Sequence, residues 1–145
     1  MPNAIYERSV RLPARPDVVF WDLLEPRNVA DYDSRMRSWI PRDYPPEVGT
    51  RVDFEAKLGP VWSKGVSEVV GFDPPHHIEV QLMKPQLPVR STMTWRLIPT
   101  EEGTEFTYRF SAAAPRGMGW LGHWLVRLAT AHLDTELPAL VDRYK

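Results

Sequence analysis

The chain has 145 residues, 43% of them apolar, a formal net charge of -1 and no cysteine. This size and composition predict one globular domain, residues 1–145, with a substantial core. The near-neutral net charge gives no electrostatic indication of nucleic-acid binding, and the lack of cysteine excludes disulfides and thiolate chemistry. We see no signal peptide and no apolar run long enough to span a membrane, so a cytoplasmic location is expected.

The first predicted element is a strand over residues 4–12, where apolar and polar side chains alternate. Pro16 suits the first position of a helix, and Asp17 suits the positive end of its dipole. We therefore expect a short helix here and a second one that begins at Pro26. The proline-rich residues 34–48 are predicted to form a loop.

From Gly49 onward the apolar residues recur at every second position. This period predicts five consecutive antiparallel strands separated by glycine and proline turns. Gly65 lies inside the second of these strands and indicates a bulge. The five strands are expected at residues 50–58, 61–72, 78–82, 89–97 and 104–111.

The last predicted element is a long amphipathic helix from about Trp120 to Tyr144. Its apolar arc covers nearly half of the helix surface. Pro138 predicts a kink near Asp134, because the proline ring removes the hydrogen bond to that carbonyl.

The order of these elements predicts the fold class, which is α+β. A meander of strands must bury its one apolar face, and only the C-terminal helix offers a surface large enough to cover it. We expect a curved antiparallel sheet wrapped around this helix. One helix fills such a trough poorly, which predicts a cavity for a small, largely apolar ligand.

Several turns and caps resemble a known superfamily. They are the segments 12–20, 39–41, 72–76 and 100–106. Together they make the chain similar to the START-like (SRPBCC) superfamily, in its polyketide cyclase/dehydrase branch, while residues 29–41 loosely resemble the coenzyme Q10-binding branch. The resemblance implies the helix-grip (Bet v 1-like) fold, with a six- to seven-stranded sheet and two short helices after the first strand. It also implies binding of a lipid, sterol, hormone, quinone or polyketide, with cyclisation or dehydration in a minority of members.

His132 and Glu136 lie four residues apart on the helix face that should point into the trough. An imidazole beside a carboxylate there can act as an acid/base pair, which makes these two our candidate catalytic residues. The structural alternative is that His132 hydrogen-bonds a core neighbour and Glu136 reaches solvent past Pro138.

Arg8 falls on the apolar face of the first strand, where a buried guanidinium must be paired. Its partner would be a ligand carboxylate or phenolate, or Glu136. The alternative is an edge or bulge position that turns it to water.

An aromatic wall is predicted around the ligand, although such residues also build cores without any ligand. Trp39 is expected to form a lid over the cavity mouth, because it lies in the proline-rich loop. The loops 34–48 and 115–119 are the candidate gates. The expected ligand-binding residues are Arg8, Trp39, Phe54, Met93, Trp95, Tyr108, Phe110, Leu125 and Leu128.

No metal or cofactor is expected. His76 and His77 are adjacent in a turn, and His123 and His132 lie on opposite sides of the helix. The sequence also has no H-E-x-x-H pattern.

The favoured function is binding of a small hydrophobic ligand by a monomer or homodimer. The first alternative is a cyclase or dehydratase with His132 as base, Glu136 orienting it, and Arg8 or Tyr108 polarising a carbonyl. The second is a protein-interaction adaptor, as in the Hsp90-activator relatives of this fold. The burial of these residues distinguishes the three functions. The enzyme hypothesis is favoured if His132 and Glu136 line a cavity beside Arg8 or a tyrosine hydroxyl.

Overall fold

A computed structural model describes residues 2–145. A strand, β1 (Ala4–Leu12), is followed by helix α1 (Pro16–Leu24), a single 3-10 turn η1 (Pro26–Asn28) and the short helix α2 (Val29–Tyr32). Six strands and two helices complete the chain. They are β2 (Met36–Pro41), β3 (Arg51–Leu58), β4 (Val61–Asp73), β5 (His77–Lys84), β6 (Arg90–Thr100), β7 (Gly103–Ala113), α3 (Gly119–Thr130) and α4 (Leu133–Arg143).

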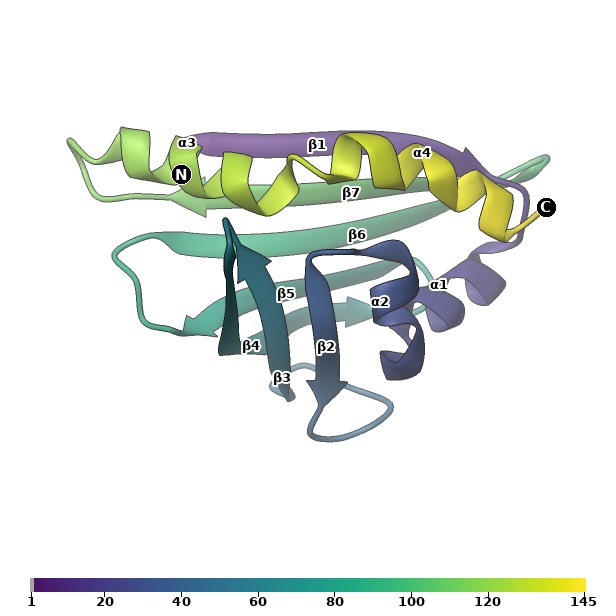
Figure 1. The fold of residues 1–145 in the computed structure, drawn as a ribbon. Helices are drawn as coiled ribbons and strands as arrows, with labels where there is room; N and C mark the ends of the chain where they lie inside the picture. The colour runs from purple at the N-terminus through teal and green to yellow at the C-terminus, as the bar shows by residue number, and fades with distance from the viewer. Residues whose placement is uncertain (1) are drawn as a thin grey trace.

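The seven strands form one antiparallel sheet in the order β1-β7-β6-β5-β4-β3-β2. The sheet curves around the C-terminal helices, which lie along β1 and β7 (Figure 1). The expected α+β helix-grip fold is confirmed, including the seven-stranded sheet and the short helices after the first strand.

The alternation of side chains along the strands gives the sheet its apolar concave face. On β6 and β7, Trp95 pairs with Tyr108, and Met93 pairs with Phe110. Helix α1 closes one end of the trough, and its Phe20 is fully buried. The core therefore lies between the concave face, α1 and the C-terminal helices.

One strand of the sheet contradicts the sequence prediction. Residues 36–41 were expected inside a loop, but they form β2, the edge strand beside β3. Pro41 ends this strand, and an edge strand tolerates proline because its outer N–H groups have no partner in the sheet. The predicted loop 34–48 is thus a strand followed by a shorter connection.

The C-terminal helix is divided in two, and the break lies close to the kink that was expected near Asp134. Helix α3 ends at Thr130 and α4 begins at Leu133, before the Asp134 carbonyl that Pro138 leaves without a donor. The buried Thr130 hydroxyl donates to the Val126 carbonyl at 2.6 Å. Such a bond often accompanies a bend in a helix, and Thr130 is the last residue before the break.

Gly65 has a different role from the predicted bulge. It pairs regularly with Phe54 of β3, and the irregular pairing of β4 with β5 begins only between Val66 and Ser67. A Cβ atom at Gly65 would lie 2.4 Å from the Phe54 ring and 2.5 Å from the Lys84 carbonyl. Glycine is required here because the ring covers the backbone.

Over residues 2–145, no helix combines the length and apolar character that crossing a membrane requires.

Candidate functional site

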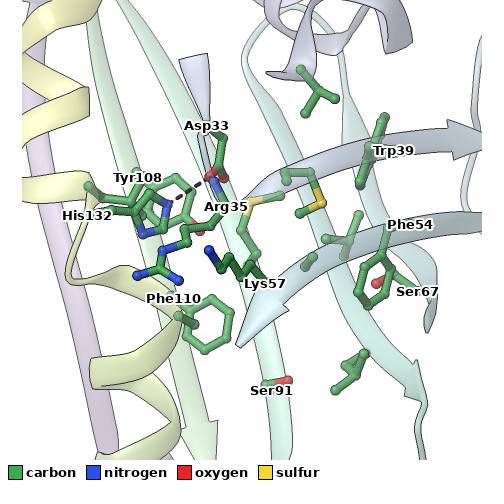
Figure 2. Close-up of a pocket in the computed structure, with 18 of the residues that line it drawn as sticks. Asp33, Arg35, Trp39, Phe54, Lys57, Ser67, Ser91, Tyr108, Phe110 and His132 are labelled. Atoms are coloured by element: carbon green, nitrogen blue, oxygen red, sulfur yellow. Dashed lines mark hydrogen bonds and ion pairs between the residues drawn. The ribbon is translucent and has the colours of Figure 1, made fainter. Parts of the chain in front are cut away.

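A cavity of about 210 Å³ lies between the concave face of the sheet and the C-terminal helices (Figure 2). It is smaller than the roughly 300–1,000 Å³ of sites that enclose drug-sized ligands. Its walls are mostly apolar side chains from β2, β3, β5, β6, β7 and both C-terminal helices. The exposed lining residues Lys64, Pro85 and Leu87 mark the side that opens to solvent.

Most of the predicted ligand-binding residues meet at this cavity. They come from four strands and α3, and the alternation of each strand directs them inward. The ones that line it are Trp39, Phe54, Met93, Trp95, Tyr108, Phe110 and Leu125. Leu128 is half-buried on α3 and is not among the lining residues.

Trp39 lines the cavity wall and is not a lid. It lies within β2, pairs with Phe54 of β3 and is only 7% exposed. The lid prediction was wrong because it depended on residues 34–48 being a loop. A buried residue inside a paired strand forms a fixed part of the wall.

Arg8 does not line the cavity. Its side chain is 54% exposed and its Nε lies 3.2 Å from Asp134 Oδ1, while the guanidinium covers the Tyr6 ring. Tyr6 donates to the same Asp134 oxygen at 2.8 Å, and burial and this contact both raise the pKa of its hydroxyl. Since β1 is an edge strand, its Arg8 turns to water and pairs with α4.

His132 lines the cavity at the break between α3 and α4, with its side chain 11% exposed. Its Nε2 lies 2.7 Å from Oδ1 of Asp33, in the segment between α2 and β2 (Figure 2). Glu136 Oε2 lies farther away, at 3.7 Å. Asp33, which the sequence analysis did not identify, is therefore the residue that orients the imidazole.

Glu136 is not among the lining residues and binds the chain between α2 and β2. Its two carboxylate oxygens accept hydrogen bonds from Ser34, one from the backbone N–H at 2.8 Å and one from the hydroxyl at 3.0 Å. The carboxylate thus fixes the segment that carries Asp33. The expected juxtaposition of Glu136 and His132 exists, but the glutamate lies behind the cavity wall.

The two nitrogens of His132 differ in their surroundings. Nε2 is occupied by Asp33, and Nδ1 is buried without a hydrogen-bond partner among the described residues. A general base must lie within hydrogen-bond reach of the proton it takes. In this arrangement Nδ1 is the one nitrogen of His132 without a partner in the described part of the chain, and it is buried.

Asp33, His132 and Glu136 are also the group that could hold a metal ion. One ligand atom from each lies within 4.8 Å of the others. A nitrogen and two carboxylate oxygens suit a divalent transition metal. All three, however, already have hydrogen-bond partners in the protein, which an ion would have to displace.

Tyr108 supplies a neutral hydroxyl to the wall beside His132 (Figure 2). Burial raises the pKa of this phenol, and the nearby Asp33 and Tyr6 raise it further. Tyr32 also lines the cavity and donates its hydroxyl to the Leu23 carbonyl. The site therefore contains phenols that act as donors and do not ionise near neutral pH.

Three cationic side chains line the cavity that the sequence analysis did not identify. They are Arg35, just before β2, Lys57 on β3 and Lys64 on β4. Asp33 is the lining carboxylate. Arg35 had no sequence signal because it lies between elements, and the two lysines belong to faces that alternation assigns to solvent.

Comparison with known families now adds to this geometry. The model of the family described as polyketide cyclase / dehydrase and lipid transport matches residues 4–145. The chain belongs to this family. The START-like resemblance predicted from the turns and caps is thereby confirmed, although no curated protein matches the sequence.

Solved structures share the fold of this polyketide cyclase/dehydrase family member. A START superfamily protein from Mycobacterium smegmatis has a TM-score of 0.73 at 10% identity, covering 97% of this chain and 99% of the other. The Zhui aromatase/cyclase from Streptomyces sp. R1128 has a TM-score of 0.72 at 14% identity, covering 95% and 90%. The protein MLL2253 from Mesorhizobium loti has a TM-score of 0.67 at 20% identity, covering 98% and 99%.

Proposed function

We propose that this protein binds a small hydrophobic or amphipathic molecule in the cavity between the sheet and the C-terminal helices. The observation that carries this proposal is the cavity itself, about 210 Å³ with walls of aromatic and aliphatic side chains and few polar groups. Apolar cavities with a few convergent polar groups are typical ligand sites. The family description, which names lipid transport beside polyketide cyclase and dehydrase, supports the same function.

The polar groups favour binding over catalysis. His132 is held by Asp33 through Nε2, and its other nitrogen is buried without a partner among the described residues. Glu136 is occupied by Ser34. Groups that are already satisfied by the protein contribute shape and orientation, whereas an acid/base catalyst needs a nitrogen or oxygen that faces the substrate.

Native mass spectrometry of the protein purified from its own host tests the proposal. We expect a retained small molecule in the wild type and its loss in Ala129→Trp, since Ala129 lines the cavity and the indole would fill it. Ala139→Trp is the matched control, because Ala139 is exposed on α4 and should leave the retained mass unchanged. Equal retention by Ala129→Trp would contradict binding in this cavity.

A cyclase or dehydratase is the second candidate function. It is favoured by one observation, the Asp33–His132 pair beside the Tyr108 phenol at the wall. In that case His132 is the base, Asp33 orients it, and Tyr108 polarises a carbonyl. His132→Ala should then abolish conversion of the molecule recovered from the host while leaving its affinity mostly intact, and equal conversion by the variant would exclude this chemistry.

A further inference from the structure

We infer that the ligand carries an acidic oxygen head group of the carboxylate type, which Arg35 and Lys57 hold at the His132 end of the cavity. This inference rests on the proposed ligand-binding function and adds the chemical class of the ligand. It depends on side chains that the apolar character of the cavity does not explain.

The backbone brings Arg35 and Lys57 together. The Lys57 N–H donates to the Arg35 carbonyl at 2.8 Å, just before β2 begins. Arg35 Nη1 donates to the Gly59 carbonyl at 2.9 Å, which fixes the guanidinium against the β3–β4 turn. Both residues line the cavity, and the Arg35 guanidinium points toward the part of it that lies between His132 and Phe110 (Figure 2). The Lys57 ammonium lies beside it and is also 5.8 Å from the centroid of the Trp62 ring.

These two cations have no counterion in the protein. Among residues 2–145, neither Arg35 nor Lys57 forms a salt bridge, although most other arginines do. The lining carboxylate Asp33 accepts the Arg35 backbone N–H at 3.1 Å and faces His132 at 2.7 Å. The Asp33 carboxylate therefore interacts with the Arg35 backbone N–H and the His132 ring, and forms no salt bridge with the side chain of Arg35 or Lys57.

A half-buried guanidinium that is held by one bond still presents donors in a planar fork. This geometry matches both oxygens of a carboxylate, and the bonds are strengthened by charge. An ammonium beside it adds a second positive charge. With Lys64 at the open side, the lining residues attract an anion toward an otherwise apolar cavity.

The test compares acids with matched alcohols. We would titrate the protein with decanoate and decanol, and with 2-naphthoate and 2-naphthalenemethanol, by isothermal calorimetry. The wild type should bind each acid roughly tenfold or more tightly than its alcohol. Arg35→Gln should weaken acid binding by about tenfold or more and leave alcohol binding unchanged.

Arg37→Gln is the matched control. Arg37 lies two residues along the chain, is exposed, stacks at 3.9 Å on the Trp62 ring and pairs with Glu55 at 3.5 Å. It does not line the cavity. Its substitution should change neither acid nor alcohol affinity, so a loss specific to Arg35 separates a contact from a general change in charge.

Each outcome decides a separate question. Equal affinity for acid and alcohol in the wild type, or an Arg35→Gln variant with undiminished preference for the acid, overturns the head-group inference and leaves the cavity as a binding site. Failure of all four probes to bind contradicts the proposed function itself. If circular dichroism shows that Arg35→Gln does not fold, Lys57→Gln gives the same comparison with the backbone bonds retained.

Discussion

At the scale of single residues, Trp95 belongs both to the core and to the cavity wall. It is buried, and its ring packs edge to face against Tyr32 and Phe106 at centroid distances of 6.4 and 5.7 Å. Aromatic pairs in this geometry stabilise beyond the area they bury. The same ring that lines the site therefore also holds β6, β7 and α2 together.

Trp95→Ala should lower the free energy of unfolding by about 3–5 kcal/mol, because the missing ring enlarges the cavity and removes these contacts. Urea unfolding followed by far-ultraviolet circular dichroism measures the effect. Trp120→Ala is the control, since Trp120 is 67% exposed on α3 and its loss should change stability by less than about 0.5 kcal/mol. Equal effects of the two substitutions would show that Trp95 is not a core residue.

Single residues also show what the sequence could and could not predict about the site. The inward positions on β3, β6 and β7 followed from alternation, since a strand sends every second side chain to one face. The hydrogen-bond partner of His132 could not be predicted from the sequence pattern. Helical spacing pointed to Glu136, but Asp33 comes from 99 residues away, and only the path of the chain after α2 brings it to 2.7 Å.

At the scale of elements, the pair of β3 and β4 depends on a close approach. The Phe54 ring lies over Gly65 and forms part of the cavity wall. The Phe54 ring occupies the space that a side chain at position 65 would take. The shape of the cavity on this side is thus set by a glycine on the neighbouring strand.

Gly65→Ala should displace the Phe54 ring and lower stability by roughly 1–3 kcal/mol, as overpacking does. Because the ring is part of the wall, retention of the host ligand should fall as well. Gly119→Ala is the control: its added Cβ would meet only the Asn3 side chain at 3.4 Å, and alanine favours the helix that begins there. Unchanged stability and retention in Gly65→Ala would contradict the close approach.

The elements that the sequence did not predict were ones without a regular pattern. In β2 the buried Trp39 is followed by the exposed Ile40 and by Pro41, and its pairing with β3 shifts after Met36. A short edge strand with a register shift leaves little alternation to detect. The helix break, in contrast, lies close to the predicted kink near Asp134, because a proline inside a helix is a strong signal in the sequence.

At the scale of the whole molecule, Asp22 connects α1 to the end of the chain. Its carboxylate accepts from Arg143 Nε at 2.6 Å, from Arg143 Nη2 at 3.1 Å and from the Tyr144 hydroxyl at 2.8 Å. The bond from Arg143 is the main cause that holds the pKa of Asp22 below its usual value, and Tyr144 adds to it. The contact fastens the C-terminal helix to α1, at the end of the trough that α1 closes.

The lowered pKa of Asp22 sets the direction of a pH effect. A carboxylate whose pKa is lower in the folded state stabilises the fold above its ordinary pKa, about 3.9, and this contribution is lost as the pH falls further. The wild type should exceed Asp22→Asn in stability by about 1–2 kcal/mol at pH 6, with the gap narrowing toward pH 3.

Urea unfolding of both proteins at several pH values measures this gap. Asp142→Asn is the control, because Asp142 is exposed and pairs only with Lys145 at 3.3 Å. Its stability should follow that of the wild type at each pH. A gap between wild type and Asp22→Asn that stays constant with pH would show that the ionised carboxylate does not contribute.

The overall architecture was the part of the molecule that the sequence predicted best. Five alternating segments in succession must share one apolar face, and the C-terminal helix was the partner with enough apolar surface for them. The chemistry of the cavity was harder to predict from the sequence, because Asp33 and Arg35 lie between elements, where periodicity carries no information.

The pairing of β1 with β7 has a consequence for how the protein is made. β1 is synthesised before the other strands of this sheet, yet Ala4 pairs with Ala112 and Leu12 with Thr104, which come much later in the sequence. Until those residues have been synthesised, β1 has no partner, and its inward face, which carries Tyr6, has no core to join. Pairings between such distant segments are slow to form. Nascent chains that stop before β7 should therefore expose an unpaired apolar strand, which chaperones and proteases recognise, and the sheet is completed only after β7 has been synthesised.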